Sequence, residues 1–465
     1  MEQTDGWWKR YGVFVVLGFD AAALAVFFYL IPGMRRPLEF LFITTAVLGL
    51  ATAVAVGSTA VRSAALLVLV LSLTLFGLEM AQKVWNITEI FEPEPVHTAG
   101  GGGEASPYAW NTRDSATWLA VREKAKAELD DPEAFVDDFA GDVFAGEASE
   151  RWTRRSRGGS KEDVTEARKA PYDEGPPLGF ELAPSNLIRH YCRDRAGGAM
   201  LWDGVCAVNA DGFRETRGGG GDAETALFLG CSVTFGYGLS DHQTTPYAFS
   251  EGYGFGMRVL NFAVSNYGAH HALRELETNH HAGRANVDPL KVVAVYYGLI
   301  DDHANRVMKP SSPATPRYRL EDGRAVYAGS YDDHPVFGRL AIMMDRSRIY
   351  PVLKDKMLRK TDAAAGGYKW ELTHAILAEM DRICRDRYGV GLTVVYWGET
   401  PAVIEGIRRN GIALIPVSDA LGTDWRKLAI KFSLADGHPN AYANRLLGRH
   451  LWRLREKADV LTDNN

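Results

Sequence analysis

The sequence predicts an α/β fold, a three-layer α/β/α sandwich with a parallel sheet, preceded by three transmembrane helices. Beyond residue 180, short apolar runs alternate with amphipathic segments, which is the pattern of βαβ units covered by helices on both faces. Apolar residues also crowd into the first eighty positions, and charge is concentrated after them. Residues able to carry chemistry follow the predicted strands, at the edge where such sheets bind ligands.

The composition excludes several other classes of protein. A length of 465 residues suggests two or three structural units. The net charge of −6 gives no electrostatic reason to expect nucleic acid as a partner. Four cysteines without a CxxC pair argue against a disulfide scaffold and against a structural zinc site. No metal or organic cofactor is implied.

Three apolar runs open the chain, at Val13–Leu30, Phe40–Val61 and Ser63–Leu78. A bilayer core of about 30 Å needs about 20 apolar residues in a helix. The second run meets this length, the first does so if Asp20 is sheltered, and the third does so when extended to Trp85. A signal peptide has one short apolar core rather than three. We therefore expect a membrane region over residues 1–90, whose flanking charges do not decide its orientation.

Residues 91–180 are expected to form a charged, partly disordered linker. Glu92–Pro95 and Gly100–Gly103 break the chain after the third apolar run, and Arg151–Lys169 has the composition of a solvated segment. The remaining residues, 181–465, then form a folded domain of their own.

Within residues 181–465, the apolar runs bounded by Gly, Pro or charge predict buried strands. These strands are Ala226–Gly230, Val259–Val264, Val292–Tyr297, Leu392–Trp397 and Ile412–Pro416. Amphipathic segments predict helices at His271–His281, Trp370–Tyr388, Ala402–Arg409 and Ala441–Asp459. Strands that alternate with helices in this way indicate a parallel sheet.

A serine directly follows the first predicted strand, in Gly230–Gly236. Ser232 is there raised on a tight strand-to-helix turn, where the following N–H groups can face an oxyanion. Serine needs a base to take its proton. Asp436 and His438 stand just before the last helix, so the aspartate can orient the imidazole and leave its other nitrogen for Ser232.

Taken together, these segments resemble the SGNH hydrolases, also called the GDSL esterase/lipase superfamily. Gly230–Gly236 is similar to the first block, with Cys231 in place of Asp, and Asp436–Pro439 is similar to the last. Val259–Gly268 resembles the second block, and Asn209–Arg214 resembles a lead-in seen in membrane-linked bacterial members. The resemblance covers roughly residues 180–465 and implies a flavodoxin-like fold with Ser232, His438 and Asp436 as catalytic triad.

The resemblance also implies an oxyanion hole, and here the sequence departs from the family. The expected donors are backbone N–H groups at Ser232 and in the second block, near Asn266 and Gly268, where Asn266 replaces a family Gly. The third block, Gly-x-Asn-Asp in the family, has Ile300 at the Asn position, or Asp301 if the register slips by one.

His303 and Arg306 follow the third block and are candidates to line the site. They could replace the missing Asn as donors, or Arg306 could pair with Asp301 or Asp302 in a purely structural role. Cys231, beside the serine, is expected to pack under the turn rather than to act as a nucleophile.

Two further residue groups are given structural interpretations. His270, His271, His280 and His281 flank one predicted helix and are expected at the surface, since ten-residue spacing puts the two pairs about 15 Å apart, too far for one metal. Cys192 and Cys206 could bridge in an oxidising compartment, but their spacing alone does not decide between bridged and free thiols.

The resulting interpretation is a membrane-anchored bacterial serine hydrolase of small acyl esters, possibly O-acetyl groups on envelope carbohydrate. Its partners would be the lipid bilayer and the esterified substrate, with no oligomeric state indicated. By resemblance, the catalytic domain lies outside the cytoplasm, on an inner-membrane anchor. Two alternatives stay open, an O-acyltransferase with the same triad and a catalytically weak carbohydrate-binding or assembly module.

Overall fold

The structure is a computed structural model that describes residues 153–157, 161–194, 200–333, 362–422 and 438–463. Residues 153–330 and 364–463 of this set belong to one compact unit. The three expected transmembrane helices and most of the expected linker lie outside the described residues. Among the helices of the described ranges, none has the length and apolar character needed to cross a bilayer.

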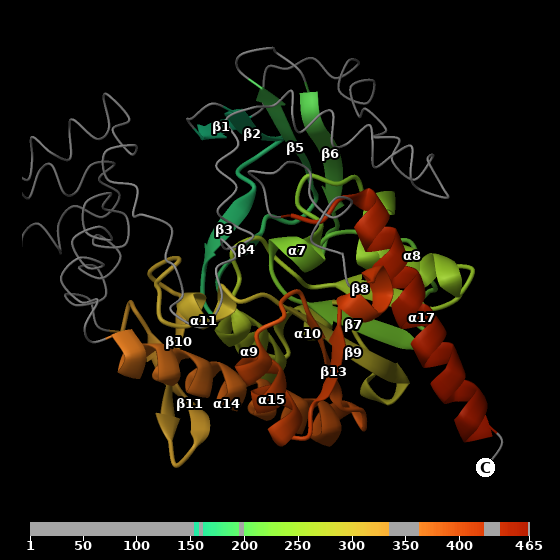
Figure 1. The fold of residues 1–465 in the computed structure, drawn as a ribbon. Helices are drawn as coiled ribbons and strands as arrows, with labels where there is room; N and C mark the ends of the chain where they lie inside the picture. Colours follow the sequence, from blue (N-terminus) through green and yellow to red (C-terminus); the bar gives the residue numbers. More distant parts are fainter. Residues whose placement is uncertain (1–152, 158–160, 195–199, 334–361, 423–437, 464–465) are drawn as a thin grey trace, which may run out of the picture. The chain divides into compact units, whose positions relative to one another are not determined.

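A five-stranded parallel sheet forms the centre of this unit (Figure 1). Its strands are β7 (Thr225–Leu229), β8 (Arg258–Asn261), β9 (Val292–Leu299), β12 (Leu392–Tyr396) and β13 (Ala413–Pro416). The strand order is β13-β12-β9-β7-β8, and all neighbouring pairs run parallel. These strands coincide, within a few residues at each end, with the five apolar runs of the sequence, and the predicted parallel sheet is confirmed.

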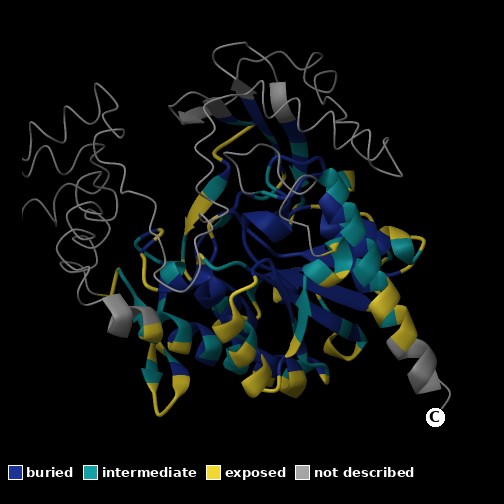
Figure 2. Cartoon of the chain, in the orientation of Figure 1, coloured by how far each residue is buried: buried dark blue, intermediate teal, exposed yellow. Residues whose placement is uncertain are grey.

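Helices cover both faces of the sheet, as β7 illustrates. Leu227 and Leu229 pack with α9 (Ala269–Thr278), α10 (His280–Arg284), α14 (Asp362–Tyr388) and α15 (Pro401–Arg409). Ala226 and Phe228 pack on the opposite face with α8 (Thr245–Gly252) and α17 (Ala441–Asp463). Because every residue of β7 is buried, the strand is apolar throughout instead of alternating (Figure 2). The three-layer arrangement is thereby confirmed.

The remaining elements are short. They are α7 (Ser232–Phe235), α11 (His303–Arg306), α16 (Ser418–Leu421), the 3₁₀ turns Asp241–Gln243 and Pro289–Lys291, and the hairpins β3 (Tyr172–Gly175)–β4 (Gly179–Leu182) and β10 (Pro316–Glu321)–β11 (Arg324–Ser330).

An antiparallel sheet corrects the expectation for residues 151–169. Its strands are β1 (Thr153–Arg157), β2 (Lys161–Ala167), β5 (Asn186–Asp194) and β6 (Met200–Val208), in that order. The charged composition misled the prediction at Glu166, whose charge has a partner on the neighbouring strand. Glu166 lies opposite Arg189 and accepts a hydrogen bond from the Tyr191 hydroxyl at 3.0 Å, while Val164 and Ala167 are fully buried.

This additional layer packs onto the loops that leave the parallel sheet. Ala167 of β2, inside the expected linker, and Ile188 of β5 share an apolar cluster with Phe235, just after the predicted nucleophile, and with Val264 and Tyr267 of the second sequence block. The segment expected to be a linker therefore supports the edge of the sheet where the site was predicted.

Cys192 and Cys206, the pair considered for a disulfide, are not bridged to each other. Cys192 faces Trp202 and Cys206 faces Ile188 across the β5–β6 ladder, so the two thiols occupy different positions of the register. Burial raises the pKa of the Cys206 thiol to about 12, which keeps it in the unreactive thiol form.

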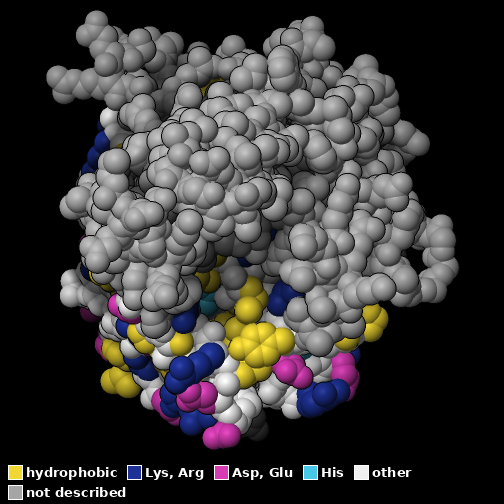
Figure 3. Space-filling model, turned by 90° about the vertical axis from the view of Figure 1, so that its left-hand side faces the viewer, with side chains coloured by type: hydrophobic (Ala, Val, Ile, Leu, Met, Phe, Trp, Pro, Cys, Tyr) yellow, Lys and Arg dark blue, Asp and Glu magenta, His cyan; other side chains and the backbone are white. Residues whose placement is uncertain are grey.

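One face of the molecule, shown in Figure 3, carries Lys and Arg side chains interspersed with Asp and Glu below the atoms drawn in grey. On the visible described surface, neither sign of charge forms a continuous stripe.

Candidate active site

The predicted nucleophile sits on a sterically crowded turn between β7 and α7. Gly230 has φ = 153°, a region that favours glycine, and Ser232 begins the short helix with 8% of its surface exposed. The side chain of Thr234 packs between two strand ends. A Cβ added at Gly230 or at Gly298, the last glycine of β9, would lie 2.3 Å or 2.0 Å from Thr234 Oγ1. Both glycines are therefore required for the turn to close.

The predicted base reaches this serine from the far end of the chain. His438 Nε2 lies 2.8 Å from Ser232 Oγ, although 206 residues separate them in sequence. A proton on Nδ1 would leave Nε2 free to accept from the serine hydroxyl. Asp436, the predicted orienting residue, lies outside the described residues, so its contact with His438 stays a prediction.

A clamp between α17 and α8 explains how His438 is placed. Asn440 caps α17 by accepting from the Ala443 N–H at 3.0 Å. Pro439 thus precedes the cap. One turn further, Asn444 Oδ1 accepts hydrogen bonds from the backbone N–H and the hydroxyl of Thr245, at 3.2 and 2.8 Å. The start of α17 is fixed against the start of α8 in this way.

Arg214 supports the nucleophile turn from below, a role that sequence reasoning did not assign. It is 1% exposed and donates to the carbonyl oxygens of Phe235, Gly236 and Leu239, while its Nε pairs with Asp241 Oδ1 at 2.8 Å. In the sequence, the motif Asn209–Arg214 stood out only through its resemblance to the family lead-in. Its buried arginine gives these three carbonyl groups a charged donor.

An aromatic contact of the base, and a second ring behind it, were also missed. The Tyr237 ring lies 5.1 Å from the His438 ring and 4.5 Å from that of His190. Burial, followed by the charges of Arg214 and His438, lowers the pKa of His190 to about 3, so this ring is neutral. No local pattern in the sequence marks Tyr237 or His190, since their neighbours are distant in the chain.

The second-block loop fits the expected oxyanion side in part. Asn266 is exposed with φ = 71°, the left-handed region that glycine or asparagine tolerates. This conformation explains why Asn can replace the family Gly there. The Gly268 N–H, however, donates to His271 Nδ1 at 3.1 Å. Gly268 is therefore not an available oxyanion donor in this structure.

The third block places no amide at the site. Ile300 packs with the apolar cluster that contains Val233 and Trp397. Asp301 accepts a short hydrogen bond from the Tyr396 hydroxyl, so its carboxylate is bound at the end of β12. The register slip that would have made Asp301 the donor therefore gains no support from its contacts.

Arg306 carries a positive charge beside the third block, and its contacts join α11 to the second-block loop. Its Nε pairs with Asp302 Oδ2 at 2.8 Å, which is one of the two structural pairings expected, and Nη1 donates to Tyr267 O at 2.9 Å. Burial alone would lower the pKa of Arg306, but Cys231 and Asp302 beside it raise the pKa. The charged guanidinium thus stands next to Cys231, the residue that precedes the nucleophile and is fully buried, as expected.

His303, which follows the third block, is fully buried and does not face solvent. Its Nδ1 lies 2.7 Å from the Tyr297 hydroxyl, and Nε2 has no hydrogen-bond partner. Burial, followed by the charge of Arg306, holds the pKa of His303 well below its ordinary value. His303 therefore occurs as a neutral ring.

The expectation of surface histidines on α9 and α10 is wrong for three of the four. His270, His271 and His281 are at most 1% exposed, and His280 is partly exposed. The strong amphipathicity of α9 hid this, because histidine counts as polar in a periodicity argument. His280 and His281 lie with Glu181 in a group of potential metal ligands, the one such group found among the described residues.

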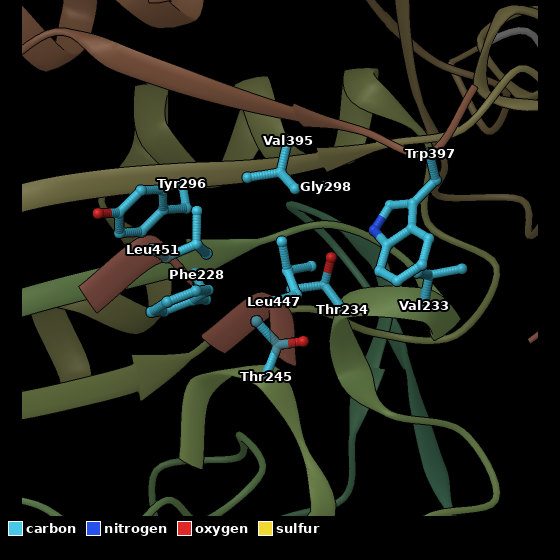
Figure 4. A pocket seen from close by; sticks show the side chains of 10 residues that line it. All are labelled: Phe228, Val233, Thr234, Thr245, Tyr296, Gly298, Val395, Trp397, Leu447 and Leu451. Atoms are coloured by element: carbon cyan, nitrogen blue, oxygen red, sulfur yellow. The ribbon is translucent and has the colours of Figure 1, made fainter. Parts of the chain in front are cut away.

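A small, partly open pocket lies beside the nucleophile helix (Figure 4). Its volume is about 20 Å³, and its lining includes Val233, Thr234 and Thr245 together with Gly298 and Trp397. That volume matches one water molecule or one methyl group.

Comparisons with known proteins give fold-level similarity only. No family model matches the chain, and no curated protein matches it. Among solved structures, it is similar to the psychrotrophic esterase EstA from Pseudoalteromonas sp., with 12% identity over 52% of this chain and 100% of that one, at a TM-score of 0.28. It is also similar to Est24, a carbohydrate acetylesterase from Sinorhizobium meliloti, with 12% identity over 51% and 99%, at a TM-score of 0.26. TesA gives 14% identity over 50% and 98%, at a TM-score of 0.29.

Proposed function

We propose that this chain is a membrane-anchored serine esterase of the SGNH (GDSL) superfamily that cleaves small acyl esters. The observation that carries the proposal is the 2.8 Å contact between His438 Nε2 and Ser232 Oγ. Two segments 206 residues apart meet there in the geometry of a nucleophile and its base, at the carboxyl end of β7.

In the proposed reaction, Ser232 Oγ attacks the ester carbonyl while His438 Nε2 takes the hydroxyl proton. The imidazolium then protonates the leaving alcohol, and an acyl-enzyme forms at Ser232. A water molecule, deprotonated by the same histidine, releases the acid and restores the serine. Asp436 would hold the Nδ1 proton of His438 in both steps.

The oxyanion would be stabilised differently from the family pattern. The backbone N–H groups at Ser232 and near Asn266 remain as donors, and the guanidinium of Arg306, next to Cys231, replaces the missing amide with a positive charge. A charged donor makes a stronger hydrogen bond to an oxyanion than a neutral one. The alternative of a weak binding module is favoured by Ile300 alone, since that residue removes the family's amide donor.

A small acyl pocket is proposed from the family resemblance of the segments around Ser232 and His438, which implies small acyl esters. Acetyl esters of envelope carbohydrate would fit this size and the proposed position at a membrane. With nitrophenyl esters of increasing acyl length, we expect turnover to be highest for acetate and to fall steeply beyond propionate. A maximum at octanoate would contradict the small acyl pocket.

Fluorophosphonate labelling of the full-length protein tests the catalytic proposal directly. The wild type should be labelled at Ser232, and Ser232→Ala should lose the label, whereas the matched variant Ser265→Ala should keep it. Label that persists in Ser232→Ala would exclude this serine as the nucleophile. Products formed with an added sugar acceptor then distinguish acyl transfer from hydrolysis.

The membrane anchor and the extracytoplasmic position of the domain are proposed from the three apolar runs before residue 80 and from the family resemblance. A C-terminal alkaline phosphatase fusion should be active in bacterial cells. An inactive phosphatase together with a fluorescent C-terminal reporter would place the domain in the cytoplasm.

A further inference from the structure

Three potential metal ligands from two distant segments meet on the outer side of α10. Glu181 belongs to β4, and His280 and His281 begin α10 about a hundred residues later. Glu181 Oε2 lies 2.8 Å from His280 Nε2 and 3.3 Å from His281 Nε2, and the three donor atoms lie within 4.8 Å of one another.

The ring of His281 is oriented toward this group by a second carboxylate. Its Nδ1 donates to Glu275 Oε2 at 2.7 Å, and both residues are almost fully buried. That bond directs Nε2 at Glu181, where it makes no hydrogen bond of acceptable geometry. Histidines that bind metals commonly have their other nitrogen bound to a carboxylate in this manner.

The two separations from Glu181 approach those of a tetrahedral ion, and the two histidine nitrogens lie within 4.8 Å of each other. Zinc bound to nitrogen and oxygen at about 2.0–2.1 Å places its ligands about 3.3 Å apart, close to the two distances measured from Glu181. The side chains of Glu181 and His280 are 19% and 17% exposed, so an ion has a path from solvent and a fourth position open to water.

Arg284 is the feature that competes with a cation. It forms a two-point pair with Glu181, Nη1 to Oε2 at 2.8 Å and Nη2 to Oε1 at 2.9 Å. Without an ion, the same residues form an ion-pair network in which a proton on His281 takes the place of the metal. If Oε2 moves to a metal, Arg284 can keep its bond to Oε1.

We propose that Glu181, His280 and His281 form a binding site for a divalent transition-metal ion, and that this ion is zinc. Glu275 acts as the orienting partner of His281. The ion would connect the β3–β4 hairpin to the start of α10, and it has no part in the proposed ester hydrolysis. The inference therefore stands or falls independently of Ser232.

The test uses the full-length protein with its affinity tag removed. Titration with Co²⁺ should give the intense visible absorption of a four-coordinate ion at a 1:1 ratio, and Zn²⁺ should abolish it by displacement. Zn²⁺ should also raise the melting temperature, because binding to the folded state alone stabilises it. Wild-type protein without a 1:1 cobalt spectrum and without a thermal shift would overturn the proposal.

Variants separate this site from adventitious binding. His280→Ala should weaken Zn²⁺ binding by at least the 10–100-fold that loss of an orienting partner costs, and His450→Ala, a histidine on α17, should leave it unchanged. Arg284→Met removes the competing cation, so binding should be retained or tightened even where the variant is less stable. Equal affinity in wild type and His280→Ala, or loss of binding in Arg284→Met, would show that the group is an ion-pair network only.

Discussion

The candidate site has a nucleophile side, the turn around Ser232, and an oxyanion side, formed by residues of the second and third sequence blocks. The two sides are held by different kinds of contact. Around Ser232, close steric fits dominate, with Thr234 packed against two glycines and Arg214 bound to three carbonyl groups. On the oxyanion side, the positions that the family would fill with donors are an isoleucine, an aspartate bound elsewhere and a glycine whose N–H is already occupied.

This difference indicates which parts of such a site can be exchanged. The turn that presents the serine depends on shapes that few residues supply, since a Cβ at Gly298 would meet Thr234 Oγ1 at 2.0 Å. Oxyanion stabilisation depends only on a donor or positive charge near one point in space. Under the proposed function, a charged arginine from α11 takes the place of an amide from the end of β9.

The largest expected effect comes from removing the nucleophile or its base. Ser232→Ala and His438→Ala should each reduce turnover of a small aryl acetate by about 10⁴–10⁶-fold, and the double variant should be no worse, because the two groups act as one unit. Steady-state kinetics measures this. A single variant that keeps a tenth of wild-type turnover would contradict the pairing of these residues.

On the oxyanion side, Arg306→Met should reduce turnover by about 10²–10³-fold, the size expected for one lost donor. Arg306→Lys should keep part of the rate, because the charge remains. Asp302→Asn is the matched control, since it breaks the ion pair but retains the guanidinium beside Cys231. The predicted loss should appear in kcat rather than in KM.

Ile300→Asn sharpens the same prediction when it is placed in the Arg306→Met background. An amide at that position restores the family donor, so part of the lost turnover should return. If Arg306→Met has no effect while Ile300→Asn alone raises turnover, the hole is deficient and Arg306 is only structural.

Each side also contains a buried histidine whose pKa is lowered to about 3, so folding stability should fall in acid. On the nucleophile side, the pKa of His190 is lowered by burial, then by Arg214 and His438; on the oxyanion side, that of His270 is lowered by burial, then by Arg306. Between about pH 6.5 and 3 the unfolded chain binds protons that the folded chain does not. Stability is then complete above pH 6.5 and decreases by about 1.4 kcal/mol per pH unit for each histidine.

Urea unfolding at pH 6.5 and 5.5 measures this slope. His270→Leu should reduce the slope of folding stability against pH by the share of one bound proton, about 1.4 kcal/mol per pH unit. His450→Ala, which removes a partly exposed histidine, serves as the comparison. An unchanged slope in His270→Leu would mean that this ring is protonated in the folded protein.

The smallest expected effect concerns the loop between the two sides. Asn266→Ala should cost about 1 kcal/mol of folding stability, because alanine tolerates the left-handed backbone at φ = 71° poorly. Asn266→Gly should be neutral or slightly stabilising. If Asn266→Ala also lowers turnover far more than Asn266→Gly, the loop geometry itself supports the oxyanion.

The sequence was sufficient for the parallel sheet and for the residues that meet at Ser232. The reason is that strands buried on both faces are apolar throughout, as in β7, and that the carboxyl ends of parallel strands share one edge. Order along the chain then placed Ser232 and His438 at the same edge.

It was insufficient where charge is neutralised by partners distant in the chain. β2 has the composition of a solvated linker, yet its Glu166 lies opposite Arg189 in a packed sheet. His281 is polar and was therefore predicted to lie at the surface, yet it is buried between two carboxylates from other elements. Composition records the charge but not its partner, so periodicity misassigns such positions.

The contact between His438 and Ser232 also bears on the order of folding. Parallel strands and helices near Ser232 join residues tens of positions apart, whereas the clamp of Asn444 on Thr245 closes a loop of 199 residues. Closing longer loops costs more chain entropy, and pairings distant in sequence form slowly. Under the proposed function, a chain whose sheet forms before α17 docks would hold a serine without its base, and esterase activity would appear only when α17 docks.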